Sequence, residues 1–164
     1  MDAYEAVLKR RSVRKYKPEP VARELLLKVL DAARLAPTAR NEQPCEFVVV
    51  TQRQKLRELA SVGENARLIG DAAACIVVLS RPCNYYLEDG SAATTQLMIA
   101  AAALGLGTCW VAGDKKPYAA NVVELCGAPP EFKLVALIAI GYAADIPTPP
   151  KRALAEVVHW ETFA

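Results

Sequence analysis

The sequence is poor in the residues that build metal sites. His159 is the only histidine among 164 residues, and the five cysteines include no Cys-X-X-Cys pair. A zinc site therefore has little support, because such sites need closely spaced cysteines and histidines. The cysteine count is odd, and Cys75 and Cys109 sit inside apolar runs. We expect reduced thiols that pack as small hydrophobes, and a cytoplasmic setting.

The sequence also lacks a strong charge imbalance and an apolar N-terminus. Lysine and arginine total 20 against 18 acidic residues, and the net charge of +2 argues against a general nucleic-acid binder. Residues 1–5 contain no apolar stretch that could act as a signal peptide. Residues 91–112 carry no charge but hold few of the Leu, Ile and Val residues that drive membrane insertion. We expect a buried helix there, not a membrane span.

What is present is enough apolar sequence for one compact domain, residues 1–164, since 53% of the residues are hydrophobic. Strands are predicted at 46–51, 74–79 and 133–141, with a short one at 108–111. Helices are predicted at 2–9, 21–35, 53–59, in the Ala-rich stretch up to Leu104, and from Pro117 to Gly127. The alternation indicates an α/β layer architecture.

Three details of these elements can be checked in a structure. The first helix is predicted to carry Tyr4, Val7 and Leu8 on one face. The second helix is predicted to turn Leu26, Leu27, Leu30 and Ala33 inward. The run Phe47-Val48-Val49-Val50 is typical of a strand buried on both faces, and the isolated Trp160 and Phe163 suggest that the tail is tied down, with a partner subunit as one candidate surface.

Two basic groups and one polar loop are candidates for ligand binding. Arg10-Arg11-Ser12-Val13-Arg14 offers guanidinium forks and a hydroxyl that suit a phosphate, although such a run also fits a solvated helix end. Lys151-Arg152, after a proline-rich turn, says little by itself. In the loop 37–44, Thr38, Asn41 and Gln43 suit the edge of a planar heterocycle, or an ordinary turn.

The glycines at 105 and 107 do not form a dinucleotide fingerprint. They follow a predicted helix instead of a strand, and the third glycine is missing. Glycines at this place are more consistent with a flat ring that approaches the backbone closely.

In this order, the motifs resemble those of the nitroreductase family along nearly the whole chain. They are Arg-Arg-Ser-Val-Arg at 10–14, Ala-Pro-Thr-Ala-Arg-Asn-Glu-Gln-Pro at 36–44, Leu-Gly-Leu-Gly-Thr-Cys-Trp at 104–110, and Ala-Ile-Gly-Tyr at 139–142 followed by Lys151-Arg152. The resemblance implies an α+β three-layer sandwich, with a central, mostly antiparallel sheet flanked by helices. It also implies a homodimer with an exchanged C-terminal tail and two FMN molecules at the interface.

The resemblance further implies roles for individual residues. Arg10, Arg11 and Ser12 would hold the FMN phosphate, joined by Lys151 and Arg152, and Arg14 would lie near the pyrimidine edge of the flavin. Thr38 and Asn41, and less closely Gln43, match residues that reach FMN from the other subunit. Asn65 falls at another flavin-contacting position, and Ala112 and Gly113 match the backbone near the reactive edge. No catalytic side chain is implied, because the cofactor carries the chemistry.

The sequence departs from the family pattern at three places. Cys45 follows Pro44 where a tryptophan is usual, and Leu68 replaces a common cation, although Arg67 is adjacent. The region 80–89 is short, so the substrate pocket is left undefined. Tyr85, Tyr86 and Trp110 are candidates to line it, or to pack at a dimer interface.

The resemblance implies an FMN-dependent enzyme that uses NAD(P)H to reduce nitroaromatics, quinones or related conjugated acceptors. Two alternatives stay open: a specialised flavin dehydrogenase or dehalogenase, and a flavin store or sensor without turnover. A nucleic-acid adaptor built on residues 10–15 would instead show steep salt dependence and no colour. His159 is interpreted as a packing residue of the tail.

Overall fold

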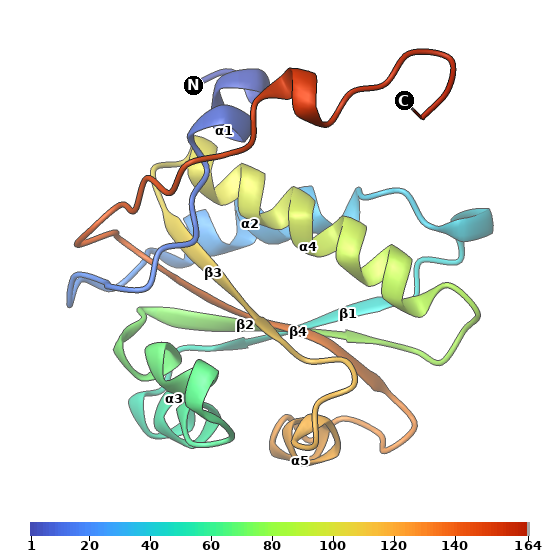
Figure 1. Ribbon diagram of the computed structural model, residues 1–164. Helices are drawn as coiled ribbons and strands as arrows, with labels where there is room; N and C mark the ends of the chain where they lie inside the picture. The colour runs from blue at the N-terminus through green and yellow to red at the C-terminus, as the bar shows by residue number, and fades with distance from the viewer. Residues whose placement is uncertain (164) are drawn as a thin grey trace.

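A four-stranded antiparallel sheet forms the centre of the molecule, and helices cover both of its faces (Figure 1). The computed structural model describes residues 1–163. The strands are β1 (Cys45–Val50), β2 (Ala74–Ser80), β3 (Gly107–Ala112) and β4 (Lys133–Gly141), in the order β1-β2-β4-β3. The helices are α1 (Ala3–Lys9), α2 (Arg23–Arg34), α3 (Arg53–Ala60), α4 (Tyr86–Ala103) and α5 (Ala119–Leu125), with 3₁₀ turns η1 (Ala39–Asn41), η2 (Glu64–Asp71) and η3 (Leu154–Glu156).

The two central strands are buried at every position except Lys133, and this burial explains their continuous apolar sequences. β2 and β4 pair through residues 74–80 and 133–140, and side chains of each strand alternate between the two helical layers. On one face, Ile76 and Ile138 pack with Leu97 of α4 and Val29 of α2. The opposite face packs against α3, η2 and α5, through residues that include Leu56, Ile69, Val77, Val122 and Leu137. The predicted three-layer α+β sandwich is confirmed.

The first strand differs from its prediction. β1 lies at the edge of the sheet and pairs only with β2, so it is not buried on both faces. Val49 is 38% exposed, and only Val50 of this strand is fully buried. A run of β-branched residues does not by itself distinguish a central strand from an edge strand, because both favour such residues.

Two helices also face differently from the sequence pattern. In α2, Leu26 and Ala33 are buried as predicted and Leu30 is half-buried, but Leu27 is 53% exposed while Val29 is fully buried. In α1, only Ala6 is buried, and the face that carries Tyr4, Val7 and Leu8 points to solvent. The exposed face of α1 is apolar, which is unusual for a surface that stays in contact with water, whereas Leu27 lies on a face of α2 that is otherwise charged.

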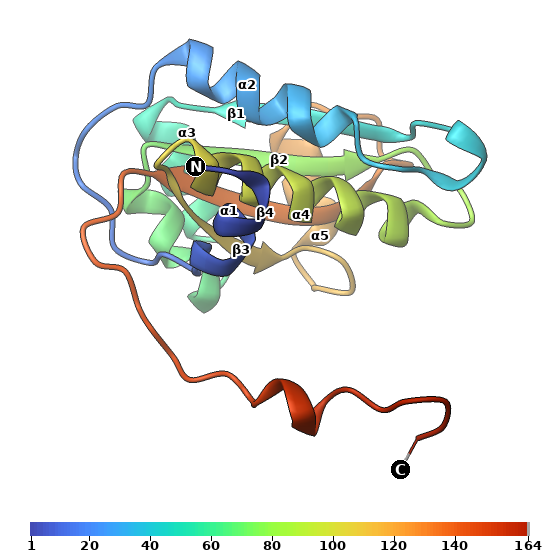
Figure 2. The ribbon, with the colours of Figure 1, turned by 90° about the horizontal axis from the view of Figure 1, so that it is seen from above.

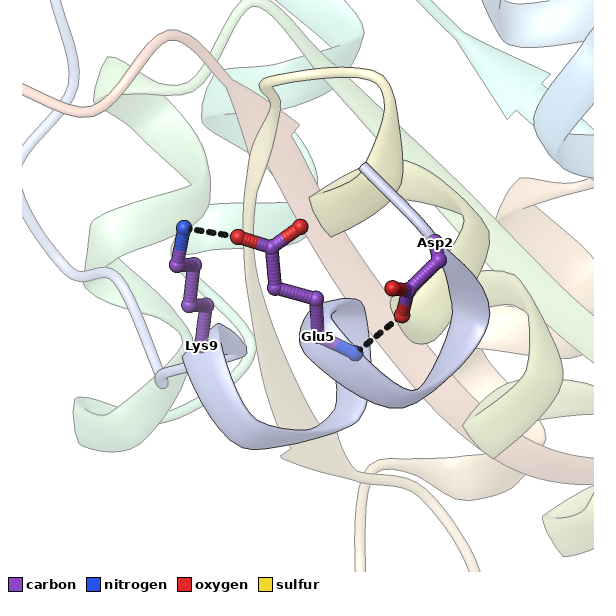
Figure 3. A network of polar contacts seen from close by, with 3 residues as sticks. All are labelled: Asp2, Glu5 and Lys9. Carbon is purple, nitrogen blue, oxygen red and sulfur yellow. Dashed lines mark hydrogen bonds and ion pairs between the residues drawn. The ribbon is translucent and has the colours of Figure 1, made fainter.

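Helix α1 begins where the sequence predicts it. The Asp2 carboxylate accepts a hydrogen bond from the Glu5 backbone amide at 2.8 Å, and the Lys9 ammonium lies 2.5 Å from Glu5 Oε1 (Figure 3). An aspartate at this position satisfies an amide that the helix leaves without an acceptor. This cap fixes the start of the helix whose other end leads into the basic segment 10–15.

The C-terminal tail leaves the body of the protein. Figure 2 shows residues beyond about 145, in orange and red, running away from the sheet and its helices. Trp160 and Phe163 are 83% and 91% exposed, so the tail is not tied down within one chain. No helix within residues 1–163 is long and apolar enough to cross a membrane.

Candidate functional site

The basic segment after α1 lies against the start of β3. Ser12 pairs with Thr108, and the Val13 amide donates to the Thr108 carbonyl at 2.9 Å. The contact requires a glycine in the strand, because a Cβ on Gly107 would lie 2.7 Å from Val13 Cγ2. The two motifs, far apart in the sequence, therefore meet at the end of α4.

This contact borders a hollow with a cationic rim. The hollow has a volume of about 200 Å³, and its lining includes Arg10, Arg11, Gly105 and Thr108. Arg11 Nη1 donates to the carbonyls of Leu8 and Arg10, at 2.7 and 2.8 Å. Its Nε is buried without a hydrogen-bond partner. A buried guanidinium nitrogen without an acceptor is costly, and an anion in the hollow would remove that cost.

The polar loop 37–44 lies at the opposite end of α4. Asp89, in the first turn of α4, accepts from the Ala39 amide at 3.0 Å, whereas the hollow is lined by Ala102 near the last turn. Positions 89 and 102 are thirteen steps apart along the helix, which corresponds to about 20 Å. Figures 1 and 2 both show η1 and α1 at opposite ends of this helix. One chain therefore does not bring Thr38 and Asn41 to the basic segment.

The third group of predicted residues follows β3. A Cβ on Gly113 would lie 2.6 Å from Leu134 Cγ and 2.9 Å from the Val135 carbonyl, so no larger residue fits. The Tyr118 hydroxyl donates to the Ala112 carbonyl, and its ring is 3.1 Å from where a Gly63 Cβ would be. Tyr118 thus links the end of β3 to the start of η2.

Asn65 is exposed on η2, two residues after Gly63. It therefore belongs to the same part of the molecule as Ala112 and Gly113. Leu68, where a cation is common in the family, is half-buried and packs against the core, while its neighbour Arg67 is exposed. The apolar residue at position 68 is thus explained by packing.

Next to Gly113, a tyrosine and a carboxylate form a hydrogen bond between two elements. The Tyr86 hydroxyl at the start of α4 donates to Asp114 Oδ1 at 2.6 Å, and this bond raises the pKa of Tyr86. Asp114 Oδ2 is buried without a partner. The pair fixes the first turn of α4 to the end of β3.

The remaining predicted residues are not assembled in one chain. Lys151 and Arg152 are exposed on the tail, where Arg152 Nη2 donates to the Glu156 carbonyl at 2.6 Å. Tyr85 is 51% exposed beside Tyr86, and Trp110 packs against the core on the α4 side. In the part of the chain that the structure describes, no three His, Cys, Asp or Glu residues are arranged to hold a metal.

Sequence reasoning missed Tyr118, Asp89 and Arg81. Arg81 Nη2 donates to the carbonyls of Glu42 and Gln43, both at 3.2 Å. One signal for Asp89 was available, because it is a charged residue immediately before a long uncharged stretch of sequence. No pattern in the sequence indicates the contacts of Tyr118 or Arg81, since both depend on residues brought together only by folding.

Comparisons with known proteins agree with this architecture. The model of the nitroreductase family matches residues 7–78 and 60–142. A protein of Archaeoglobus fulgidus, provisionally named NADH dehydrogenase/NAD(P)H nitroreductase, is 34% identical over 143 residues, which is 83% of this chain and 82% of the relative.

Two solved structures are similar over almost their whole length. One is from Parabacteroides distasonis and carries the same provisional name; it has a TM-score of 0.92 and 32% identity, and the match covers 98% of both chains. The other, described as an FMN-dependent nitroreductase from Clostridium difficile R20291, has a TM-score of 0.90 and 29% identity, over 96% of this chain and 98% of that one. The chain belongs to the nitroreductase family.

Proposed function

We propose that this protein is an FMN-dependent oxidoreductase that uses NADH or NADPH to reduce nitroaromatic, quinone or related conjugated acceptors. Within a nitroreductase-family chain, the observation that carries this proposal is the cationic hollow with its buried, unpartnered Arg11 Nε. The similar protein from Clostridium difficile is described as FMN-dependent, and the Archaeoglobus relative is named for NADH and NAD(P)H. Residues 1–164 would form one FMN-binding domain.

The residues at the hollow fit the phosphate of FMN. Arginine forks bind phosphate through paired N–H donors. Arg11 and Val13 line the hollow and Ser12 between them does not, so the role of the Ser12 hydroxyl rests on the motif alone. Arg10 is half-buried at the rim, so its charge is close to the hollow and only partly screened by water. Arg14 is exposed, with Nη1 3.3 Å from the Ser12 carbonyl, and most of its guanidinium donors are available to the pyrimidine edge of the flavin.

A second copy of the chain would complete this site. A two-fold axis across α4 sets the first turn of one helix beside the last turn of the other, which brings Thr38, Asn41 and Gln43 of one copy near the basic segment of its partner. Exposed apolar side chains support such an interface, since Tyr4, Leu8 and Leu27 are each more than half exposed. The projecting tail, with Leu154 76% exposed, would pack on the second copy and add Lys151 and Arg152.

When bound, FMN supplies the redox chemistry by accepting hydride from the nicotinamide and passing it to the acceptor. The chain binds and orients the reactants. Arg14 would stabilise negative charge at the pyrimidine edge. Gly113 packs without a side chain against Leu134 and Val135, and this contact would fix the backbone of residues 112 and 113 beside the reactive edge. No side chain is assigned a proton-transfer role.

Rapid-mixing kinetics test this function. In the absence of oxygen, we expect NADH or NADPH to bleach the flavin absorbance, and a quinone or nitroaromatic added afterwards to restore it. In the steady state, we expect double-reciprocal plots with parallel lines. A protein that binds FMN but is not reduced by either nicotinamide would contradict the enzyme. That result would favour a flavin store or sensor, a reading that the short connection of residues 81–85 between β2 and α4 keeps open.

A further inference from the structure

The loop 38–43 has an energetically unfavourable backbone. Arg40, Asn41 and Gln43 have φ angles of 53°, 57° and 48°, in the left-handed region. Asparagine tolerates this region, but arginine and glutamine do so at a cost, because their Cβ atoms approach the backbone. Three such residues within four positions persist only when surrounding contacts hold them, and this kind of strain is characteristic of functional sites.

Two side chains from outside the loop supply those contacts. Asp89 of α4 accepts a hydrogen bond from the Ala39 amide, fifty residues away in sequence, at 3.0 Å. Arg81 holds the carbonyls of Glu42 and Gln43 from the other side. Within the loop, the backbone amide of Gln43 donates to Thr38 Oγ1 at 3.1 Å. The loop is therefore fixed at its beginning and at its end.

Burial of a carboxylate at position 89 costs free energy. Asp89 is only 5% exposed, forms none of the ion pairs found in residues 1–163, and its Oδ2 is buried without a partner. A buried carboxylate costs free energy that the start of a helix offsets in part. A hydrogen bond from an amide to a charged acceptor is stronger than one to a neutral acceptor. The Asp89 carboxylate therefore holds the Ala39 amide firmly.

We propose that Asp89 is a positioning residue of the flavin site. It holds the Ala39 amide and so keeps the strained loop in the shape that directs Thr38 and Asn41 toward the cofactor of a second copy. This role rests on the proposed function. Arg81 is the second tether of the same loop.

The test compares Asp89→Ala and Asp89→Asn with a control on the same helix. Gln96→Ala is the control. Gln96 Nε2 donates to the Ala32 carbonyl of α2 at 2.7 Å, so this substitution removes one hydrogen bond of α4 far from the loop. Two quantities are measured: the hydrogen-exchange rates of the amides of residues 39–43 without FMN, and the Kd of FMN for the apoprotein.

We expect Asp89→Ala to speed exchange at Ala39 and the following amides, and to raise the Kd of FMN about tenfold. Asp89→Asn keeps an acceptor oxygen and should be intermediate, while Gln96→Ala should leave the loop and the Kd close to wild type. If Asp89→Ala does not fold, Arg81→Gln serves instead, because the Arg81 side chain is exposed. Arg81→Gln should also speed exchange of the loop amides and raise the Kd of FMN.

Two results would overturn the role. One is faster loop exchange with an unchanged Kd, which would make the tether irrelevant to the cofactor. The other is an equal effect of Asp89→Ala and Gln96→Ala on both quantities, which would reduce Asp89 to general stability. If wild-type protein binds no FMN, the proposed function and the cofactor role fall together, and exchange at residue 39 then shows only whether Asp89 holds the loop.

Discussion

At the scale of single residues, the close approaches around the site leave no room for side chains. Gly113 lies against the backbone of Val135, and neither can move without shifting β4, one of the two central strands. Gly105 is different, since it needs its positive φ of 79° and has open space around it. The two glycines are required for different reasons, steric contact and backbone conformation.

Alanine at each glycine separates these reasons. Gly113→Ala should cost about 3 kcal/mol of unfolding free energy through overpacking, and should also lower FMN affinity. Gly105→Ala should cost about 1 kcal/mol through its left-handed backbone. Denaturant unfolding measures the loss of unfolding free energy in each variant. Equal losses would show that the packing around Gly113 is loose enough to accept a methyl group.

The thiol of Cys45 gives a prediction about pH. Burial, followed by the charges of Asp89, Cys83 and Glu46, raises the pKa of Cys45 from 9.0 to about 11. Because the folded pKa exceeds the unfolded one, the protonated thiol contributes stability that is complete below pH 9 and is lost as the pH rises toward 11. As the pH rises from 9 to 11, we expect the unfolding free energy of wild type to fall relative to that of Cys45→Ala, because the variant has no thiol to ionise. A constant difference would contradict this.

At the scale of elements, α1 and α4 position the basic segment. α1 ends at residue 9 and leads directly into it, so a looser α1 should leave Arg10 and Arg11 less fixed. Asp2→Ala removes the cap shown in Figure 3 and should destabilise α1 by about 1 kcal/mol, with faster hydrogen exchange in residues 5–9. Lys9→Ala, which removes only an exposed ion pair, should have a smaller effect; a larger one would contradict the role of the cap.

Element identity follows from sequence better than element environment does. The β4 strand has the predicted bounds, 133–141, because nine residues rich in Val, Leu and Ile between polar turns are typical of a buried strand. The edge position of β1 and the exposure of Leu27 depend on which elements pack together, and local patterns carry no such information. The same holds at the candidate site: the motif residues are visible in the sequence, but the tethers from Asp89, Arg81 and Tyr118 arise from folding.

At the scale of the whole molecule, the arrangement of one chain is incomplete as a cofactor site. The basic segment and the polar loop lie at opposite ends of α4, and the apolar side chains of the tail are exposed. The proposed two-fold dimer would account for both features with one interface.

Removing residues 147–164 tests the role of the tail. The tail is outside the core, so the truncated chain should keep its helix and sheet content by circular dichroism. Light scattering after size-exclusion chromatography should show a weakened dimer, and the protein should lose FMN on dilution. A truncated protein that stays dimeric and keeps its flavin would contradict the proposed exchange of tails.

The cofactor content of the purified protein tests most directly whether this chain holds FMN. The visible spectrum of the purified protein is recorded, the cofactor is released by heat, and it is identified and counted per chain. We expect a yellow protein with about one FMN for each copy of the chain, since each dimer would form two equivalent sites. A colourless protein that also fails to bind added FMN would contradict the proposed function and leave only the family fold.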